Sequence, residues 1–141
     1  MRPTHKKRLL MLANALETRI PADRFDLADW RLHAEGQYEE ERRRYVSDHE
    51  LLHGCGFAGC AVGWACALPE FNEQGLYWDG AMPAYQHGPE GPLFGHFDAV
   101  NWFFGLKQEH SNLLFAAGSY EGKAGPLDVA RRIRFFVAAR S

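Results

Sequence analysis

The chain has 141 residues, of which 46% are hydrophobic and 24% are charged, and its formal net charge at pH 7 is -2. This length is sufficient for one domain with a hydrophobic core, and the composition excludes a disordered or fibrous protein. The nearly balanced charge argues against a protein that works mainly by neutralising phosphates, so we expect no nucleic-acid partner.

No stretch of the sequence approaches the run of about 18 apolar residues that a transmembrane helix needs. Asn14 and Glu17 interrupt the apolar stretch that follows the basic first residues, and no small-residue cleavage site follows, which is not the pattern of a signal peptide. Three cysteines are too few, and odd in number, for a disulfide framework. We therefore expect a cytoplasmic protein without a membrane segment.

Two segments in the first half of the chain have the pattern of helices. Leu9, Leu12 and Leu16 recur with helical spacing and predict a helix over residues 5–18. Residues 58–68 are apolar on nearly every side of a helix, which is typical of a central helix that the others surround. The glycines within this segment lower helix propensity, so we interpret them as positions where a neighbour packs closely.

The second half begins with a different pattern. Residues 76–96 are rich in glycine, proline and aromatic residues, which predicts an ordered loop or a small hairpin. Apolar spacing then predicts helices over 97–105, over 107–116 and from Pro126 onward. The sequence shows no internal repeat and no linker, so we expect one domain over residues 1–141. Together these elements predict a mainly α fold, a compact bundle of five or six helices with a small hairpin or loop insertion.

A cysteine–histidine cluster is the first candidate for chemistry. His49, His53, Cys55 and Cys60 lie close together in the sequence, and two imidazoles with two thiolates could hold zinc in a tetrahedral site. Their spacing, H-x3-H-x-C-x4-C, is tighter than the usual zinc-finger layout. Alternatively, Cys60 and Cys66 are small buried residues of the central helix, because free cysteine is among the most buried residue types. We prefer the second interpretation, with zinc as the alternative cofactor.

The same segment also allows a cysteine nucleophile. Cys60 lies at the predicted start of the central helix, where unpaired backbone N–H groups lower the pKa of a thiol. His96, followed by Asp98, is the best-placed base with its orienting acid, and His53 and His87 are rival bases. The chain after Cys60 is short for the sheet of a papain-like enzyme. We therefore favour a protein that is not an enzyme.

The aromatic residues of segment 76–96 form the candidate recognition surface. Tyr77, Trp78, Tyr85 and Phe94 lie beside predicted turns, and large aromatic side chains supply contact area at a low cost in conformational entropy. Alternatively, Tyr77 and Trp78 cover the core. We predict that this surface binds a protein partner or a second copy of the chain, for which a symmetric dimer is the usual form.

The string Cys55-Gly-Phe57-x-x-Cys60-Ala-Val-Gly-Trp64 resembles the C-G-T-x-x-C-A-x-G-W/H core of a set of small proteins from bacteria and their phages. The resemblance covers most of the chain except residues 31–52, which it marks as an insertion. It implies a bacterial or phage origin and a shared role for Cys55 and Cys60, but no particular reaction, cofactor or partner. The histidines of the zinc and nucleophile interpretations are not part of the pattern, and Phe57 stands where the pattern has threonine.

Overall fold

A computed structural model describes residues 1–33 and 45–140 of the chain. These residues form seven α-helices and two small antiparallel sheets, with 52% of the described residues in helices and 13% in strands. The fold is therefore mixed α/β, and the prediction of an all-α or mainly α bundle is wrong. Within the described residues, no helix is long and apolar enough to cross a membrane.

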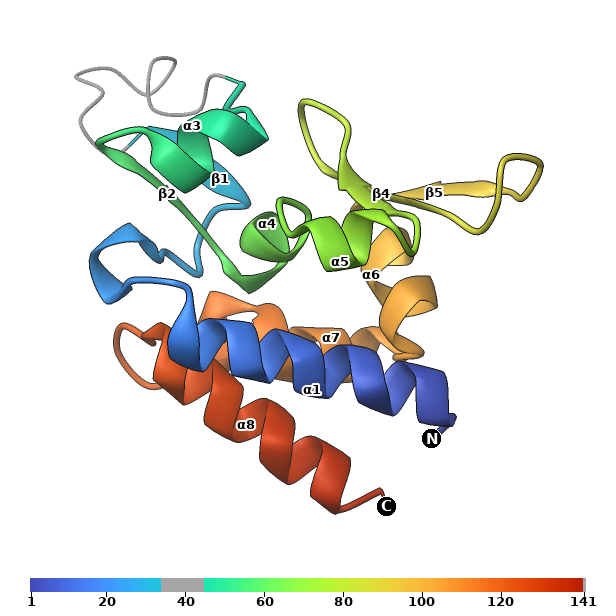
Figure 1. The fold of residues 1–141 in the computed structure, drawn as a ribbon. Coiled ribbons are helices and arrows are strands. Elements are labelled where there is room, and N and C mark those ends of the chain that lie inside the picture. The colour runs from blue at the N-terminus through green and yellow to red at the C-terminus, as the bar shows by residue number, and fades with distance from the viewer. Residues whose placement is uncertain (34–44, 141) are drawn as a thin grey trace.

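Two long helices from opposite ends of the chain pack side by side (Figure 1). Helix α1 (Pro3–Thr18) begins with a proline, which suits a first helical turn because its N–H groups have no partner within the helix. Helix α8 (Pro126–Ala138) begins in the same way. The helices predicted over residues 5–18 and from Pro126 onward are confirmed. Between α1 and α8 in the sequence lie the short 3-10 helix Ala22–Arg24, helix α7 (Gln108–Phe115) and the short 3-10 helix Ala117–Ser119.

A two-stranded sheet replaces the first part of the predicted central helix. Strand β1 (Arg31–His33) pairs antiparallel with β2 (Phe57–Gly59). Only α4 (Ala61–Ala65) remains of the helix predicted over residues 58–68, since backbone pairing with a distant segment outweighs the local apolar pattern. Helix α3 (Asp48–His53) packs on β2, and α5 (Pro69–Asn72) follows α4. Residues 34–44 of the predicted insertion 31–52 lie outside the described residues.

The segment predicted as a loop or hairpin over 76–96 forms a three-stranded antiparallel sheet. Its strands β3 (Leu76–Trp78), β4 (Pro83–Gln86) and β5 (Leu93–Gly95) follow one another in the order β3-β4-β5. Helix α6 (His96–Phe104) starts directly after β5 and packs against β4 and β5. The sheet projects at the upper right of Figure 1, and the N-terminal end of α1 lies below α6.

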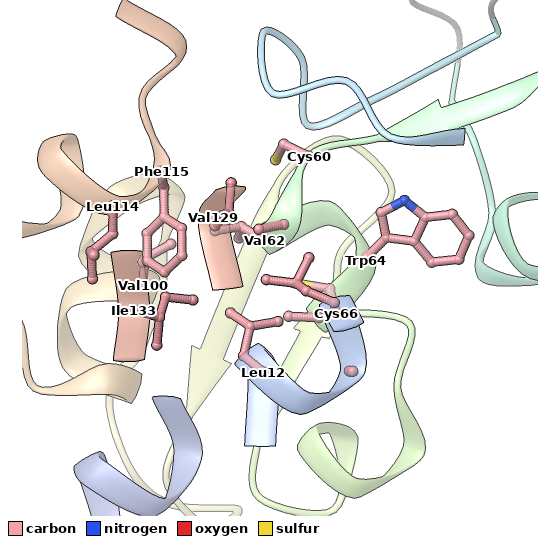
Figure 2. Close-up of a cluster of buried hydrophobic side chains, with 14 of the residues drawn as sticks. Leu12, Cys60, Val62, Trp64, Cys66, Val100, Leu114, Phe115, Val129 and Ile133 are labelled. Atoms are coloured by element: carbon pink, nitrogen blue, oxygen red, sulfur yellow. The ribbon is translucent and has the colours of Figure 1, made fainter. Parts of the chain in front are cut away.

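Helix α4 lies at the centre of the hydrophobic core. All five of its residues are buried, and it packs against α1, β2 and β3. In the view of Figure 2, Val62 points toward Val129 and Cys66 lies near Leu12, whereas the Trp64 ring points to the opposite side. The side chains from α6, α7 and α8 that take part in this cluster are Val100, Leu114, Phe115, Val129 and Ile133.

Candidate functional site

Cys60 belongs to the core rather than to a reactive surface. It is the N-cap of α4, and its Sγ accepts a hydrogen bond from the backbone N–H of Gly63 at 3.4 Å. Hydrogen bonds from the helix start favour the thiolate, but burial outweighs them and raises the pKa of Cys60 to about 11. Burial likewise raises the pKa of Cys66. Both side chains are therefore neutral thiols at pH 7, whereas Cys55 is exposed.

The residues of the predicted nucleophile arrangement are not linked to one another. His96 is exposed at the start of α6, where its backbone has a φ of 58°, and its ring meets the edge of Trp30 with centroids 5.4 Å apart. Asp98 is exposed in the first turn of the same helix. No hydrogen bond within the described residues joins Cys60 to His96.

The residues of the predicted zinc site are likewise separated by burial. His49 and His53 are exposed on α3, with ring centroids 5.1 Å apart. Cys55 is exposed after that helix, whereas Cys60 is 2% exposed in the core. Among residues 1–33 and 45–140, no group of three or more His, Cys, Asp or Glu side chains is arranged to hold a metal ion.

Arg31 and Gly63 hold the start of β1 close to α4. Arg31 is 5% exposed, and its guanidinium donates to the carbonyl oxygens of Gly63 and Val46 and to the Asp48 carboxylate at 2.7 Å. A Cβ atom at Gly63 would overlap the carbonyl group of Trp30, so the backbone approach requires glycine. The Arg31 hydrogen bonds and the absence of a side chain at Gly63 therefore position β1 against α4.

The four aromatic residues of the predicted recognition surface lie in different environments. Tyr85 is 6% exposed, and its ring packs edge-on against Phe103. Trp78 is half-buried beneath the Arg31 guanidinium, which lies 4.3 Å from the ring centroid. Tyr77 and Phe94 are also half-buried.

Phe94 forms part of the candidate binding site, together with Trp102. Its ring stacks on that of Trp102, with centroids 4.9 Å apart and planes 20° apart, and Trp102 is 60% exposed. Both rings line a pocket of about 670 Å³ between the start of α1, the strands β4 and β5, and the end of α6. Among the described residues, no acidic side chain lines this pocket, whereas four arginine and histidine side chains do: Arg2, His5, Arg8 and His87.

Arg8 is the buried cation of this pocket. It is 8% exposed, its Nε donates to Gln74 Oε1 at 2.9 Å, and its Nη1 donates to the carbonyl oxygen of Phe103 at 2.8 Å. The guanidinium also lies 4.1 Å from the centroid of the Phe103 ring. These contacts fix a positive charge between α1, α6 and the turn after α5.

His5 contributes a polar ring rather than a further charge at neutral pH. Burial lowers its pKa, and the nearby cations Arg8 and Arg2 lower it further. The ring lies so close to Gly105 that a Cβ atom there would overlap it. The permanent positive charges of the pocket are therefore those of Arg2 and Arg8.

Sequence reasoning missed Arg8 and Trp102, although both leave a signal. Arg8 precedes Leu12 by one helical turn and adjoins Leu9, so it interrupts the apolar face of the first predicted helix. Trp102 lies between inward-facing Val100 and Phe103, where the helical period turns a side chain away from the core. A buried arginine and an exposed tryptophan are both departures from the usual distribution of residue types.

Comparisons with protein-family models, with curated proteins and with solved structures find no match to this chain.

Proposed function

We propose that the protein is a non-enzymatic binding module that engages an acidic segment of a protein partner in the pocket between α1, β4–β5 and α6. The proposal rests on the stacked pair Phe94–Trp102, which lies on the wall of a pocket that the described residues line with two arginines and no acidic side chain. Tryptophan and arginine are the residue types that most often dominate the free energy of binding at protein interfaces. The resemblance to bacterial and phage proteins leads us to propose an accessory factor of such an organism.

The composition of the pocket favours a protein segment over other occupants. Its positive charge complements carboxylates, and its exposed ring offers a stacking surface for an apolar side chain of the same segment. A nucleic acid would need a longer track of cations along its backbone, and the chain as a whole carries a net charge of -2. A second copy of the chain is the remaining occupant.

Selection from a random peptide library displayed on phage tests the proposal without a known partner. We expect the enriched peptides to combine an acidic residue with an aromatic or large apolar one. Their affinity should fall at least about tenfold with Trp102→Ala, because truncating a central tryptophan costs about 2 kcal/mol or more of binding free energy. Phe135→Ala is the matched control, since Phe135 is 71% exposed on α8 and does not line the pocket.

Three results would overturn the proposal. Selected peptides that bind Trp102→Ala as tightly as the wild type would place the binding surface elsewhere. A single-stranded oligonucleotide that binds the wild type at physiological salt, and loses binding with Trp102→Ala, would assign the pocket to nucleic acid. A dimer in sedimentation experiments that Trp102→Ala dissociates would assign it to self-association.

A further inference from the structure

Among the described residues, Arg8 and Arg31 are the arginines that are more than nine-tenths buried, and they differ in whether a carboxylate pairs with them. Arg31, at 5% exposure, has the Asp48 carboxylate as its counterion at 2.7 Å. Arg8, at 8% exposure, makes no ion pair with any carboxylate of the described residues. A buried charge is costly unless it is paired, so the absence of a counterion at Arg8 calls for a physical explanation.

Part of the Arg8 guanidinium is available to a ligand. Arginine has five N–H donors, and within the described residues two nitrogens of Arg8 donate, Nε to Gln74 and Nη1 to Phe103. The third nitrogen, Nη2, makes no hydrogen bond with the described residues. Trp78 Nε1 is a polar atom that is both enclosed and without a partner among those residues, whereas Arg8 Nη2 is not enclosed in this way. Nη2 therefore reaches accessible space. Arg8 lines the pocket that holds Trp102, and it also lines a second pocket, whose lining includes Glu73.

Because of these contacts, Arg8 is already oriented for an anion. Gln74 holds the guanidinium through Nε and the Phe103 carbonyl group holds it through Nη1, so little side-chain entropy remains to be lost on binding. Partial burial also strengthens a charge-assisted hydrogen bond relative to one made at the surface. Arg2, which is exposed on the same pocket, lacks both advantages.

We propose that Arg8 is a carboxylate-binding residue, and that the ligand of the pocket places a carboxylate on Arg8 and an aromatic ring on Trp102. This inference rests on the proposed function and specifies its ligand as a segment in which an acidic group and an aromatic side chain lie within one pocket length of each other. The carboxylate then serves as the missing counterion of the buried cation.

A pair of small probes that differ only in charge tests the inference. N-acetylphenylalanine carries both groups, whereas N-acetylphenylalaninamide carries the ring without the carboxylate. We expect the acid to bind about tenfold more tightly than the amide in titrations followed by NMR, as a hydrogen bond to a charged group predicts. Only the acid should shift the Arg8 Nε–Hε resonance, and both should shift the Trp102 indole resonance.

Two variants assign the difference to Arg8. Arg8→Met keeps a long side chain without the charge and should bind the two probes equally. Arg2→Gln, which removes an exposed cation from the same pocket, should retain most of the preference for the acid. If Arg8→Met does not fold, the ratio of affinities in the wild type and the Arg8 resonance still decide.

The outcomes separate this inference from the proposed function. Equal binding of the acid and the amide at Trp102 would overturn the role of Arg8 and leave the pocket as a binding surface. A preference for the acid without a shift at Arg8, or one that Arg2→Gln abolishes, would place the carboxylate on another cation. Failure of both probes to shift Trp102 would overturn both proposals.

Discussion

At the scale of single residues, the backbone at Gly63 approaches the Trp30 carbonyl group too closely for a side chain to fit between them. A Cβ atom at Gly63 would lie 2.9 Å from the Trp30 carbonyl carbon and closer still to its oxygen. We expect Gly63→Ala to lower the free energy of unfolding by at least about 2 kcal/mol, because the backbone of β1 and α4 must separate. Urea denaturation measures this.

Gly118→Ala is the matched control, since a Cβ atom at Gly118 would meet no atom within 4 Å. It should change the free energy of unfolding by no more than about 0.5 kcal/mol. Equal effects at the two glycines would show that helix or turn propensity, and not the close approach, accounts for the requirement at position 63.

The buried thiol of Cys60 makes stability depend on alkaline pH. Its pKa is raised from 9.0 to about 11 by burial, so the unfolded chain loses this proton at a lower pH than the folded chain does. The contribution of this site is complete below pH 9 and is lost as the pH rises toward the folded-state pKa. By pH 10.5 the wild type should have lost about 2 kcal/mol more than Cys60→Ala, in urea titrations over that range.

Cys60→Ala also removes the cap of α4, which lowers the stability of the variant by an amount that does not depend on pH. The test is therefore the slope of stability against pH, and not its absolute value. Cys55→Ala is the control, because Cys55 is exposed, and its profile should follow that of the wild type. Parallel profiles for wild type and Cys60→Ala would mean that this thiol ionises alike in the folded and unfolded chains.

At the scale of elements, the stability of α3 depends on its N-cap residue, Ser47. Ser47 and Glu50 form a capping box, in which Ser47 Oγ accepts from the Glu50 N–H at 3.1 Å and Glu50 Oε1 accepts from the Ser47 N–H at 3.2 Å. The helix is only six residues long and carries Asp48, the counterion of Arg31. We expect Ser47→Ala to lower the free energy of unfolding by about 1 kcal/mol.

Thr4→Ala is the comparison for this change, because Thr4 is exposed in the first turn of α1 without a capping hydrogen bond. Hydrogen exchange should show earlier opening of α3 amides in Ser47→Ala than in the wild type, and no change in Thr4→Ala. Unchanged exchange in both variants would mean that packing on β2 alone holds α3.

The elements also show where sequence reasoning succeeds and where it fails. The helix at residues 5–18 was predictable because its apolar residues follow a period that refers only to the helix itself. The strand at Phe57–Gly59 was not, because three apolar residues look alike in a buried strand and in a buried helix. Its conformation depends on Arg31–His33, a segment far away in the sequence.

The candidate site shows the same division. Phe94, an aromatic residue beside a predicted turn, lines the pocket, and its role in recognition stays a prediction. The pocket itself was not predictable, because α1, β5 and α6 come together only through the tertiary fold. The cysteine motif looked chemical in sequence because spacing indicates proximity but not burial, and burial keeps Cys60 protonated.

At the scale of the whole molecule, the packing of α8 on α1 joins the end of the described chain to its beginning. Ile133 is fully buried in the common core, whereas Phe135, two residues later on the same helix, is 71% exposed. If the core is one cooperative unit, removing side-chain atoms at Ile133 must weaken every element that surrounds α4, and the pocket beside α1 with them.

We therefore expect Ile133→Ala to lower the free energy of unfolding by about 2–5 kcal/mol, through lost burial and the cavity left behind. Phe135→Ala should change it by no more than about 0.5 kcal/mol, although it removes the larger side chain. Tryptophan fluorescence reports on four places at once, and circular dichroism reports on the helices. The four tryptophans are Trp30 before β1, Trp64 in α4, Trp78 in β3 and Trp102 in α6. If the fluorescence and circular dichroism transitions of Ile133→Ala coincide, α8 supports the pocket through the shared core. If the fluorescence transition stays at the wild-type midpoint, the pocket folds independently of α8.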